Sequence, residues 1–393
     1  MIIMRIKKIL SNIIAVMVLG FIVMAGHVTI NASEISDIIY EINLKIPEES
    51  AIFAEKNYKD ILAASYPYYT QIVSDDWNEY SLGEPYVIYD PDATTWNEVY
   101  YYPILYKNEI VLVASIINTT NGWTLSASDE IIDGLKKINY KDNSSLFYEL
   151  DDCILAVSNE ETKVIQSDEK EKSLNYNKKE KKFEEISSIE KASEILENID
   201  NMKPVDIKQI QFSTQNNNIK EEYTPLFSED RNSGSDYIKV CSLYNKQGQG
   251  SLPICWAASI ATIVNYRLGT NYTAKDICDN EGLEYKGANI DTKQQALKTY
   301  GLFYDKMTSQ LSWELIVKNI NNKYLIAAST FDGRGNGHSI TVYGYKFTNA
   351  NKYIVLHNPG TNDTQIVLYK TGGSTYTYNN KTWTWTKSLY YYR

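Results

Sequence analysis

Cysteine is scarce in this sequence, which contains Cys153, Cys241, Cys255 and Cys278 among 393 residues. Four cysteines are too few for the disulfide framework of a small secreted domain. The sequence also lacks a CxxC motif and any paired Cys/His spacing, which excludes the common structural zinc sites. We therefore expect no metal site, and the cysteines need another explanation.

Long apolar runs are also rare, and the one that stands out is near the start of the chain. Three basic residues precede the apolar residues 13–25, and the small residue Ala32 follows them. The apolar run is too short to span a bilayer comfortably, so residues 1–32 are predicted to be a cleaved secretory signal peptide. An uncleaved anchor is the alternative. We expect an exported, extracellular protein without a stable membrane anchor, and the excess of Asn, Ile, Lys and Tyr is typical of an AT-rich bacterial genome.

Charge is distributed unevenly along the chain. Residues 33–235 carry 19 basic and 39 acidic side chains, a net charge of −20, whereas residues 236–393 carry 17 basic and 10 acidic side chains, a net charge of +7. Opposite fields favour docking of the first segment on the second. The alternative is that the acidic stretch only keeps an exported chain soluble.

Composition divides the acidic segment in two. Residues 33–157 are dense in aromatic and β-branched residues and are predicted to be a compact α+β unit, whereas residues 158–235 are charged and polar. Apart from one amphipathic helix expected at 187–199, the latter segment has little apolar surface to offset the entropy of ordering. It is predicted to be an exposed linker that is cut between about Pro225 and Asp236. Its Lys178–Lys182 run is interrupted and surrounded by acids, so we expect no nucleic-acid binding.

Periodicity predicts an α+β fold in both folded parts. The N-terminal part shows strand patterns at 86–89, 100–105 and 110–117, the last two forming a hairpin. The C-terminal part begins with a helix that starts at Cys255 and ends before Gly269, with Pro253 just ahead of it. Short capped helices are expected at 273–276, 291–301 and 312–320, followed by antiparallel strands at 324–330, 337–345 and 353–358 and an alternating tail at 376–391.

Cys255 stands at the predicted start of this helix. Unpaired backbone N–H groups and the helix macrodipole favour a negative charge there, and they lower the pKa of a thiol. A thiolate nucleophile would be placed at such a position. A lone cysteine beside Trp256 and Ala257 is also an ordinary small buried side chain, so other residues must decide between the two.

Histidine is scarcer still, with His27, His338 and His357. His27 falls within the predicted signal peptide. A cysteine nucleophile needs a base, and imidazole has the pKa that suits neutral pH. His338 follows the glycine-rich loop 332–337 and opens an alternating strand, where it is accessible to a substrate. His357 lies inside a strand and is expected to be a packing or surface residue.

Two amides complete the candidate site. Asn358 ends a predicted strand on the face opposite His357, where it can hold an imidazole by its second nitrogen, although Asn-Pro-Gly is also ordinary turn chemistry. Gln249 precedes Cys255 by six residues. Its amide can stabilise a developing oxyanion together with the Cys255 backbone N–H.

In chain order, Gln249, Cys255-Trp256 at a helix start, Gly337-His338 at a strand start and Asn358-Pro359 at a strand end form a pattern. This pattern resembles papain-like cysteine peptidases, in which the glutamine precedes the cysteine by six residues and a tryptophan follows it. With its signal peptide, long pro-region and compact C-terminal domain at 236–393, the chain is similar to staphopain-type secreted bacterial cysteine peptidases.

The resemblance implies a papain-like catalytic domain of helices and an antiparallel half-barrel. It implies a Cys255/His338/Asn358 triad, an oxyanion hole at Gln249, and a zymogen whose acidic pro-segment blocks the cleft until it is cut. Protein or peptide substrates and a dedicated inhibitor protein are the expected partners. Papain-like enzymes usually carry a tryptophan soon after the asparagine, whereas Gly360 and Thr361 are found here, so Trp383 or Trp385 are the candidates to replace it.

We therefore expect a secreted endopeptidase that needs no metal or organic cofactor. The nearest enzymatic alternative is another Cys/His acyl transferase, such as an amidase or a transglutaminase-like enzyme, which commonly uses a different third residue. A secreted binding protein on a decayed peptidase fold is the non-enzymatic alternative. In that protein, aromatic residues near the C-terminus, such as Trp383 and Trp385, would contact a partner.

Overall fold

The computed structural model describes residues 46–90, 98–138, 145–150, 153–157, 162–167, 237–243, 245–348 and 351–392. The predicted signal peptide and the helix expected at 187–199 lie outside these residues. No helix in the described ranges is both long enough and apolar enough to cross a membrane.

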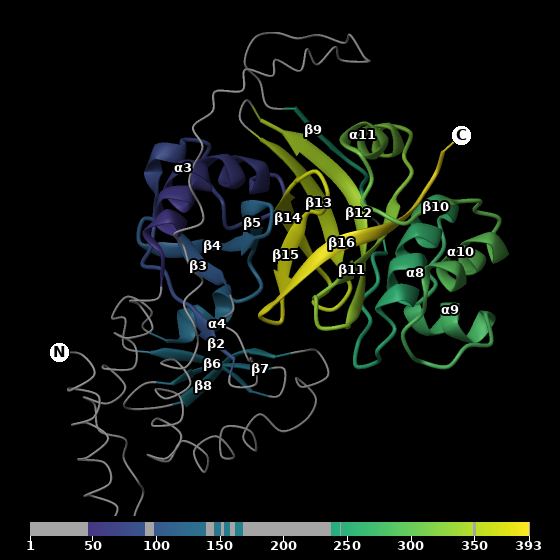
Figure 1. Cartoon of the computed structure of the whole chain (residues 1–393), viewed down its shortest axis with the longest axis horizontal. Helices are drawn as coiled ribbons and strands as arrows, with labels where there is room; N and C mark the ends of the chain where they lie inside the picture. Colours follow the sequence, from purple (N-terminus) through teal and green to yellow (C-terminus); the bar gives the residue numbers. More distant parts are fainter. Residues whose placement is uncertain are drawn as a thin grey trace, which may run out of the picture.

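The N-terminal region combines helices with two sheets (Figure 1). The long helix α3 packs on strands β3, β4 and β5, and a second, four-stranded sheet has the order β2-β6-β7-β8. The elements are α3 Glu48–Ser65, η1 Trp77–Glu79, β1 Tyr80–Leu82, β2 Ile88–Tyr89, β3 Val99–Tyr106, β4 Glu109–Thr119, β5 Gly122–Ser128, α4 Ile132–Lys137, β6 Leu146–Leu150, β7 Cys153–Val157 and β8 Thr162–Ser167. The hairpin predicted around residues 107–109 is confirmed, whereas β8 lies beyond residue 157, where a linker was expected.

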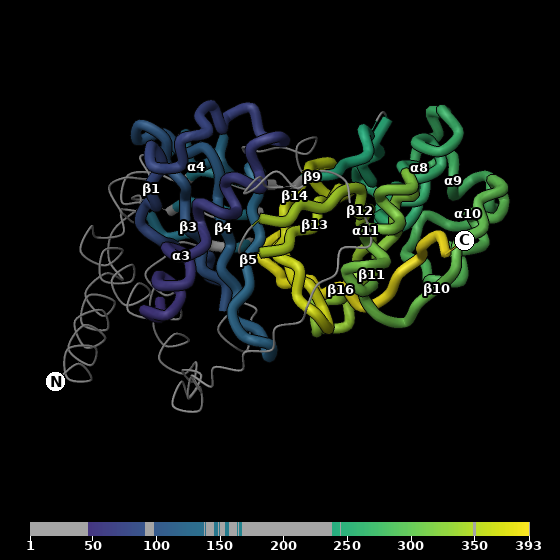
Figure 2. Tube along the Cα trace, turned by 90° about the horizontal axis from the view of Figure 1, so that it is seen from above, coloured from purple at the N-terminus to yellow at the C-terminus, as the bar shows by residue number. Residues whose placement is uncertain are grey.

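The C-terminal region has its helices first and most of its strands afterwards, as predicted. Figure 2 shows helices α8, α9 and α10 on the far side of the strands from the N-terminal region. The elements are β9 Tyr237–Val240, α8 Cys255–Leu268, α9 Ala274–Asn280, α10 Ile290–Thr299, β10 Asp305–Met307, α11 Trp313–Asn321, β11 Ile326–Phe331, β12 Gly337–Phe347, β13 Lys352–Asn358, β14 Asp363–Leu368, β15 Thr375–Tyr378 and β16 Lys381–Tyr390.

One sheet joins the two regions. Its order is β1-β3-β4-β5-β14-β13-β12-β11-β16-β10, with β15 paired to β16 and β9 paired to β12. Strands β5 and β14 make the junction through the antiparallel pairs Ile366–Ala127 and Val367–Ser126. The N-terminal region therefore covers what would otherwise be the edge strand of the C-terminal sheet.

Helix α8 has the bounds that the sequence predicts. It begins at Cys255 and ends at Leu268, and the next residue, Gly269, adopts the left-handed conformation with φ 67° and donates its N–H to Asn265 O. Glycine takes this conformation without a steric penalty. The ten residues from Trp256 to Asn265 are all buried, because the helix packs against α9, α10, β11 and β12. Burial on every side fixes the position of the first residue of α8.

The C-terminal tail differs from the prediction. The alternating residues 376–391 form a hairpin of two strands, β15 and β16, rather than one continuous strand. The turn is Asn379-Asn380, and both residues have positive φ, 48° and 50°. Two consecutive positive φ angles are typical of a type I′ hairpin turn, and asparagine tolerates them better than most residues.

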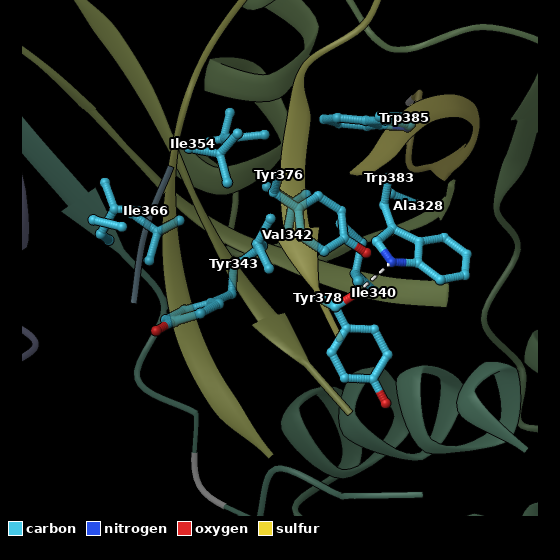
Figure 3. Packing of buried hydrophobic residues seen from close by; sticks show 14 of the residues in the cluster. Ala328, Ile340, Val342, Tyr343, Ile354, Ile366, Tyr376, Tyr378, Trp383 and Trp385 are labelled. Atoms are coloured by element: carbon cyan, nitrogen blue, oxygen red, sulfur yellow. Dashed lines mark hydrogen bonds between the residues drawn. The ribbon is translucent and has the colours of Figure 1, made fainter. Parts of the chain in front are cut away.

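A single cluster of buried apolar side chains runs from α3 in the N-terminal region to α8 in the C-terminal region. Figure 3 shows the part of it around Ile340, Val342 and Ile354, over which the β15–β16 hairpin places Tyr376 and Trp385. A second, smaller cluster lies between β4, α4 and the four-stranded sheet. The shared cluster holds the two described regions together independently of their charge.

Candidate active site

Cys255 is the first residue of helix α8 and is partly exposed. The preceding residue, Ile254, provides no side-chain cap. The first N–H groups of the helix have no intrahelical partners, so this end of α8 attracts negative charge. The local structure thus presents the Cys255 sulfur where a thiolate is favoured.

His338 and Asn358 meet across the neighbouring strands β12 and β13. His338 Nε2 lies 2.8 Å from Asn358 Oδ1, and the same Oδ1 accepts the backbone N–H of Gly360 at 3.0 Å. Because a backbone N–H can only donate, the shared atom of Asn358 acts as an acceptor towards both groups. His338 Nε2 therefore carries the donated proton, and Nδ1 remains to exchange a proton with a thiol.

Two aromatic rings of the β15–β16 hairpin cover this pair. The Tyr378 ring stacks on the His338 ring at a centroid distance of 4.8 Å and an angle of 26°, and the Trp383 ring is tilted against it at 5.4 Å. A Cβ at Gly360 would lie 2.2 Å from the Tyr378 hydroxyl, so Tyr378 needs a glycine there. Figure 3 shows Tyr378 and Trp383, joined by the hydrogen bond from Trp383 Nε1 to the Tyr378 carbonyl oxygen. Of the two tryptophans expected near Asn358, Trp383 is the one that contacts His338.

The surroundings of Cys255 stabilise its ionised form. Burial raises the pKa of Cys255, but the opposing influences together outweigh it and the pKa is lowered. These influences are, in order, the charge of His338, a hydrogen bond from its ring, the charge of Lys293 and a hydrogen bond from the Ser339 backbone. The interaction with His338 brings the cysteine into the same site as the His338–Asn358 pair.

Gln249 lies on the loop that passes Asn358. Its backbone N–H donates to Pro359 O at 2.8 Å, and the adjacent Gly248 is so close to Asn362 that a Cβ would lie 3.3 Å from Asn362 Cβ. The side-chain Oε1 of Gln249 is buried and has no hydrogen-bond partner among the described residues. The structure therefore packs the Gln249 loop against the loop that follows β13.

His357 is a packing residue. It is fully buried, its Nε2 lies 3.0 Å from Asn362 Oδ1, and its Nδ1 has no partner among the described residues. Burial is the main cause that lowers the pKa of His357 to about 3. Its imidazole is neutral and separate from the His338–Asn358 pair, as the strand pattern indicated.

The other described cysteines differ from Cys255. Cys241 and Cys278 are buried free thiols rather than a disulfide, and burial is the main cause that raises the pKa of each, that of Cys278 to about 11. Cys153 begins β7, and its side chain lies outside the described atoms. No three His, Cys, Asp or Glu side chains in the described ranges gather as the ligands of a metal would.

The sequence patterns missed two side chains of this site. Tyr378 could not be identified because the β15–β16 turn was not predicted. Lys293 lies on α10 with Ala296 and Leu297, at helical spacing, and all three are buried. A lysine on the apolar face of an amphipathic helix was the signal that could have drawn attention to it.

Residues 236–371 match the family model described as papain-like cysteine protease AvrRpt2. The matched residues include Cys255, His338 and Asn358. The match supports the papain-like resemblance and does not single out the staphopain type. No curated protein matches the chain. The chain is therefore a cysteine-type peptidase with a papain-like C-terminal region.

Proposed function

We propose that the chain is a secreted cysteine endopeptidase made as a zymogen, and that it hydrolyses peptide bonds through Cys255, His338 and Asn358. The observation that carries the proposal is the arrangement around His338. The ring donates to Asn358 through Nε2 at 2.8 Å and also interacts with the Cys255 thiol, whose pKa is lowered. A nucleophile, a base and a group that orients the base are the parts that acyl transfer requires.

In the first half of the reaction, the Cys255 thiolate attacks the carbonyl carbon of the substrate peptide and a C–S bond forms. The negative charge moves to the carbonyl oxygen, which accepts hydrogen bonds from the Gln249 side-chain amide and the Cys255 backbone N–H. The His338 imidazolium gives its Nδ1 proton to the leaving nitrogen as the C–N bond breaks. The products are a free amine and an acyl-enzyme.

In the second half, neutral His338 takes a proton from water, and the water oxygen attacks the thioester carbon. The C–S bond then breaks, the carboxylic acid leaves, and the thiolate–imidazolium pair is restored. Asn358 holds the ring throughout, because its Oδ1 accepts the hydrogen bond from the Nε2–H group. Support for this role comes from the Gly360 N–H, which donates to the same oxygen at 3.0 Å and thereby fixes the amide.

The N-terminal region is the proposed intramolecular inhibitor. The contacts between this region and the C-terminal region support the proposal. Besides the β5–β14 pairing, the Tyr69 hydroxyl donates to Thr364 O at 2.6 Å. Asp60 accepts the Tyr353 hydroxyl at 2.5 Å and the Asn351 amide at 2.7 Å. Such a surface suits a folded pro-segment that leaves only after the chain is cut.

The N-terminal region also contacts two segments close to His338, the β15–β16 hairpin that covers its ring and the loop that precedes it in the chain. Asn380, in the turn of the hairpin that carries Tyr378, accepts the Tyr101 hydroxyl at 3.0 Å and donates to Glu149 at 2.8 Å. Arg334, in the loop just before His338, forms an ion pair with Asp90 at 3.3 Å. These contacts support a pro-segment that restrains the walls of the site until maturation.

The catalytic part of the proposal is tested with the Cys255→Ala variant, with Cys278→Ala as the matched thiol control. We expect Cys255→Ala to leave the precursor uncut and casein undigested, and Cys278→Ala to keep both activities. Casein hydrolysis by purified Cys255→Ala at the wild-type rate would exclude Cys255 as the nucleophile.

Export and maturation are tested by sequencing the N-terminus of protein from culture medium, with and without a thiol-directed inhibitor. We expect a terminus between residues 225 and 236 without the inhibitor and near residue 33 with it. A fully active extracellular protein that retains the acidic segment would contradict the zymogen proposal.

A further inference from the structure

Helix α10 places a lysine in the interior beside the candidate nucleophile. Lys293 is only 4% exposed. Its Nζ donates to Ser329 Oγ on β11 at 2.7 Å and to Ser339 Oγ on β12 at 3.1 Å. Both contacts are buried and link α10 to the two strands that precede and carry His338.

A buried ammonium group is costly unless an anion compensates it. Within the described residues no carboxylate forms an ion pair with Lys293, and two neutral hydroxyl groups are its hydrogen-bond partners. Burial is the main cause that lowers the pKa of Lys293 to about 8; the Cys255 thiolate opposes this change, and the charge of Lys387 on β16 adds to it. Among the described residues, the anion whose charge acts on this ammonium group is the Cys255 thiolate.

Ser339 connects the lysine to the cysteine. Its hydroxyl accepts from Lys293, its backbone hydrogen-bonds to Cys255, and it directly follows His338 in the chain. In the part of the chain that the structure describes, Lys293 on α10 and His338 on β12 are the cations that act on the sulfur. The lysine is held away from solvent, so salt screens its charge less than that of a surface lysine.

We propose that Lys293 is a positioning residue of the peptidase, whose ammonium group keeps the Cys255 sulfur ionised and holds Ser339 against it. The inference rests on the proposed role of Cys255 as nucleophile. It adds a second fixed cation to the thiolate–imidazolium pair, so the sulfur is favoured as a thiolate before it attacks the substrate and again when the C–S bond of the acyl-enzyme breaks. Lys293 touches neither substrate nor the reacting carbonyl and acts only through Cys255 and Ser339.

The test measures the pH dependence of Cys255 alkylation by iodoacetamide in the full-length protein, followed by peptide mass spectrometry. Lys293→Met removes the charge and the hydrogen bonds, whereas Lys293→Gln removes the charge and keeps amide donors for the two serines. Lys298→Met removes an exposed charge from the same helix and is the matched control. Thermal unfolding of each variant reports whether the fold is retained.

We expect both Lys293 variants to move the midpoint of alkylation to higher pH by roughly one unit, and Lys298→Met to leave it unchanged. An alkylation midpoint that is unchanged in folded Lys293→Gln would overturn the inference. If the midpoint shifts in Lys293→Met alone, hydrogen bonding to the two serines suffices without the charge. If Lys293→Met does not fold, the alkylation midpoint of Lys293→Gln alone tests the inference.

The same experiment separates this inference from the proposed function. A wild-type Cys255 that is alkylated at low pH, together with unshifted Lys293 variants, leaves the proposed nucleophile in place and removes the role of Lys293. A wild-type Cys255 that reacts no faster than Cys278 at any pH overturns both.

Discussion

Two His–Asn pairs lie near the end of strand β13, and their hydrogen bonds are almost the same. His338 Nε2 is 2.8 Å from Asn358 Oδ1, and His357 Nε2 is 3.0 Å from Asn362 Oδ1. Because His357 and Asn358 are adjacent in the strand, the two pairs lie on opposite faces. On one face the imidazole interacts with the Cys255 thiol, whereas on the other it is fully buried.

The difference shows that an amide partner alone does not make a histidine a catalytic base. Burial is the largest influence on His357 and lowers its pKa to about 3, despite the opposing effect of the hydrogen bond that its ring donates to Asn362 Oδ1. A group with such a pKa stays neutral near pH 7 and cannot hold a proton for a leaving group. The His338 ring also interacts with the ionisable thiol of Cys255. This interaction distinguishes the two faces of β13.

The largest expected effect on activity comes from replacing each histidine by a side chain that does not titrate. His338→Ala should lower kcat/KM for a peptide substrate by roughly 10³- to 10⁴-fold, because it removes the base and a cation that stabilises the thiolate. His357→Gln should change kcat/KM by less than about tenfold, since its ring takes no part in the chemistry. Steady-state hydrolysis of one fluorogenic peptide measures both, and equal losses in the two variants would abolish the distinction between the faces.

The next comparison replaces the asparagine partner of each histidine. Asn358→Ala should lower kcat by roughly 10²-fold, because the His338 ring loses the acceptor that fixes its orientation and tautomer. Asn362→Ala removes the corresponding acceptor of His357 and should have little effect on kcat. The kinetics of both variants with the same peptide provide the measurement. Unchanged kcat in Asn358→Ala would remove Asn358 from the machinery.

The buried histidine should instead affect stability at acid pH. An unfolded histidine has a pKa near 6.5, whereas that of His357 is about 3 in the folded chain. Below pH 6.5 the unfolded chain binds a proton that the folded chain excludes, so the stabilisation is complete above 6.5 and is lost as pH falls towards 3. One proton corresponds to about 1.4 kcal/mol of unfolding free energy per pH unit.

Denaturant unfolding between these pH values, in a Cys255→Ala background that prevents autolysis, provides the measurement. His357→Gln should remove this part of the slope, and His338→Ala serves as the comparison on the other face. Parallel stability curves for the His357→Gln variant and its background would contradict the assigned burial of the His357 ring.

The smallest expected effect concerns the aromatic cover of the His338–Asn358 bond. Tyr378→Leu removes a ring stacked at 4.8 Å and should cost about 0.5–1.5 kcal/mol of stability, with a several-fold loss of kcat/KM as water reaches the bond. Tyr378→Phe keeps the ring and is the control. If Tyr378→Leu behaves like Tyr378→Phe, the ring is not a significant shield.

Local signals predicted the bounds of helix α8 well. Pro253 and Gly269 bound the helix, and helical spacing of apolar residues placed Cys255 at its start. His338 and His357 could be distinguished because one opens a strand and the other is internal to a strand. These inferences needed information only from residues close in sequence.

Long-range features could not be obtained in this way. The pairing of β5 with β14 depends on two segments more than 200 residues apart, and neither carries a local signal of its partner. The burial of Lys293 follows from the packing of α10 on the sheet, where tertiary contacts override the usual exposure of lysine. The charge imbalance suggested docking of the two regions, but strand pairing and a shared apolar core could not be inferred from it.

The most direct test of the central claim compares the three described free cysteines within one protein. Full-length protein is treated with limiting iodoacetamide at about pH 6, where an ordinary thiol is almost entirely protonated. Labelling is mapped by mass spectrometry, and the peptidase activity that the labelled protein develops after maturation is measured. The lowered pKa of Cys255 and the raised pKa values of Cys241 and Cys278 predict that Cys255 is labelled first and that activity falls in proportion. Labelling of Cys255 no faster than the other two, or full activity after its complete modification, would contradict the account.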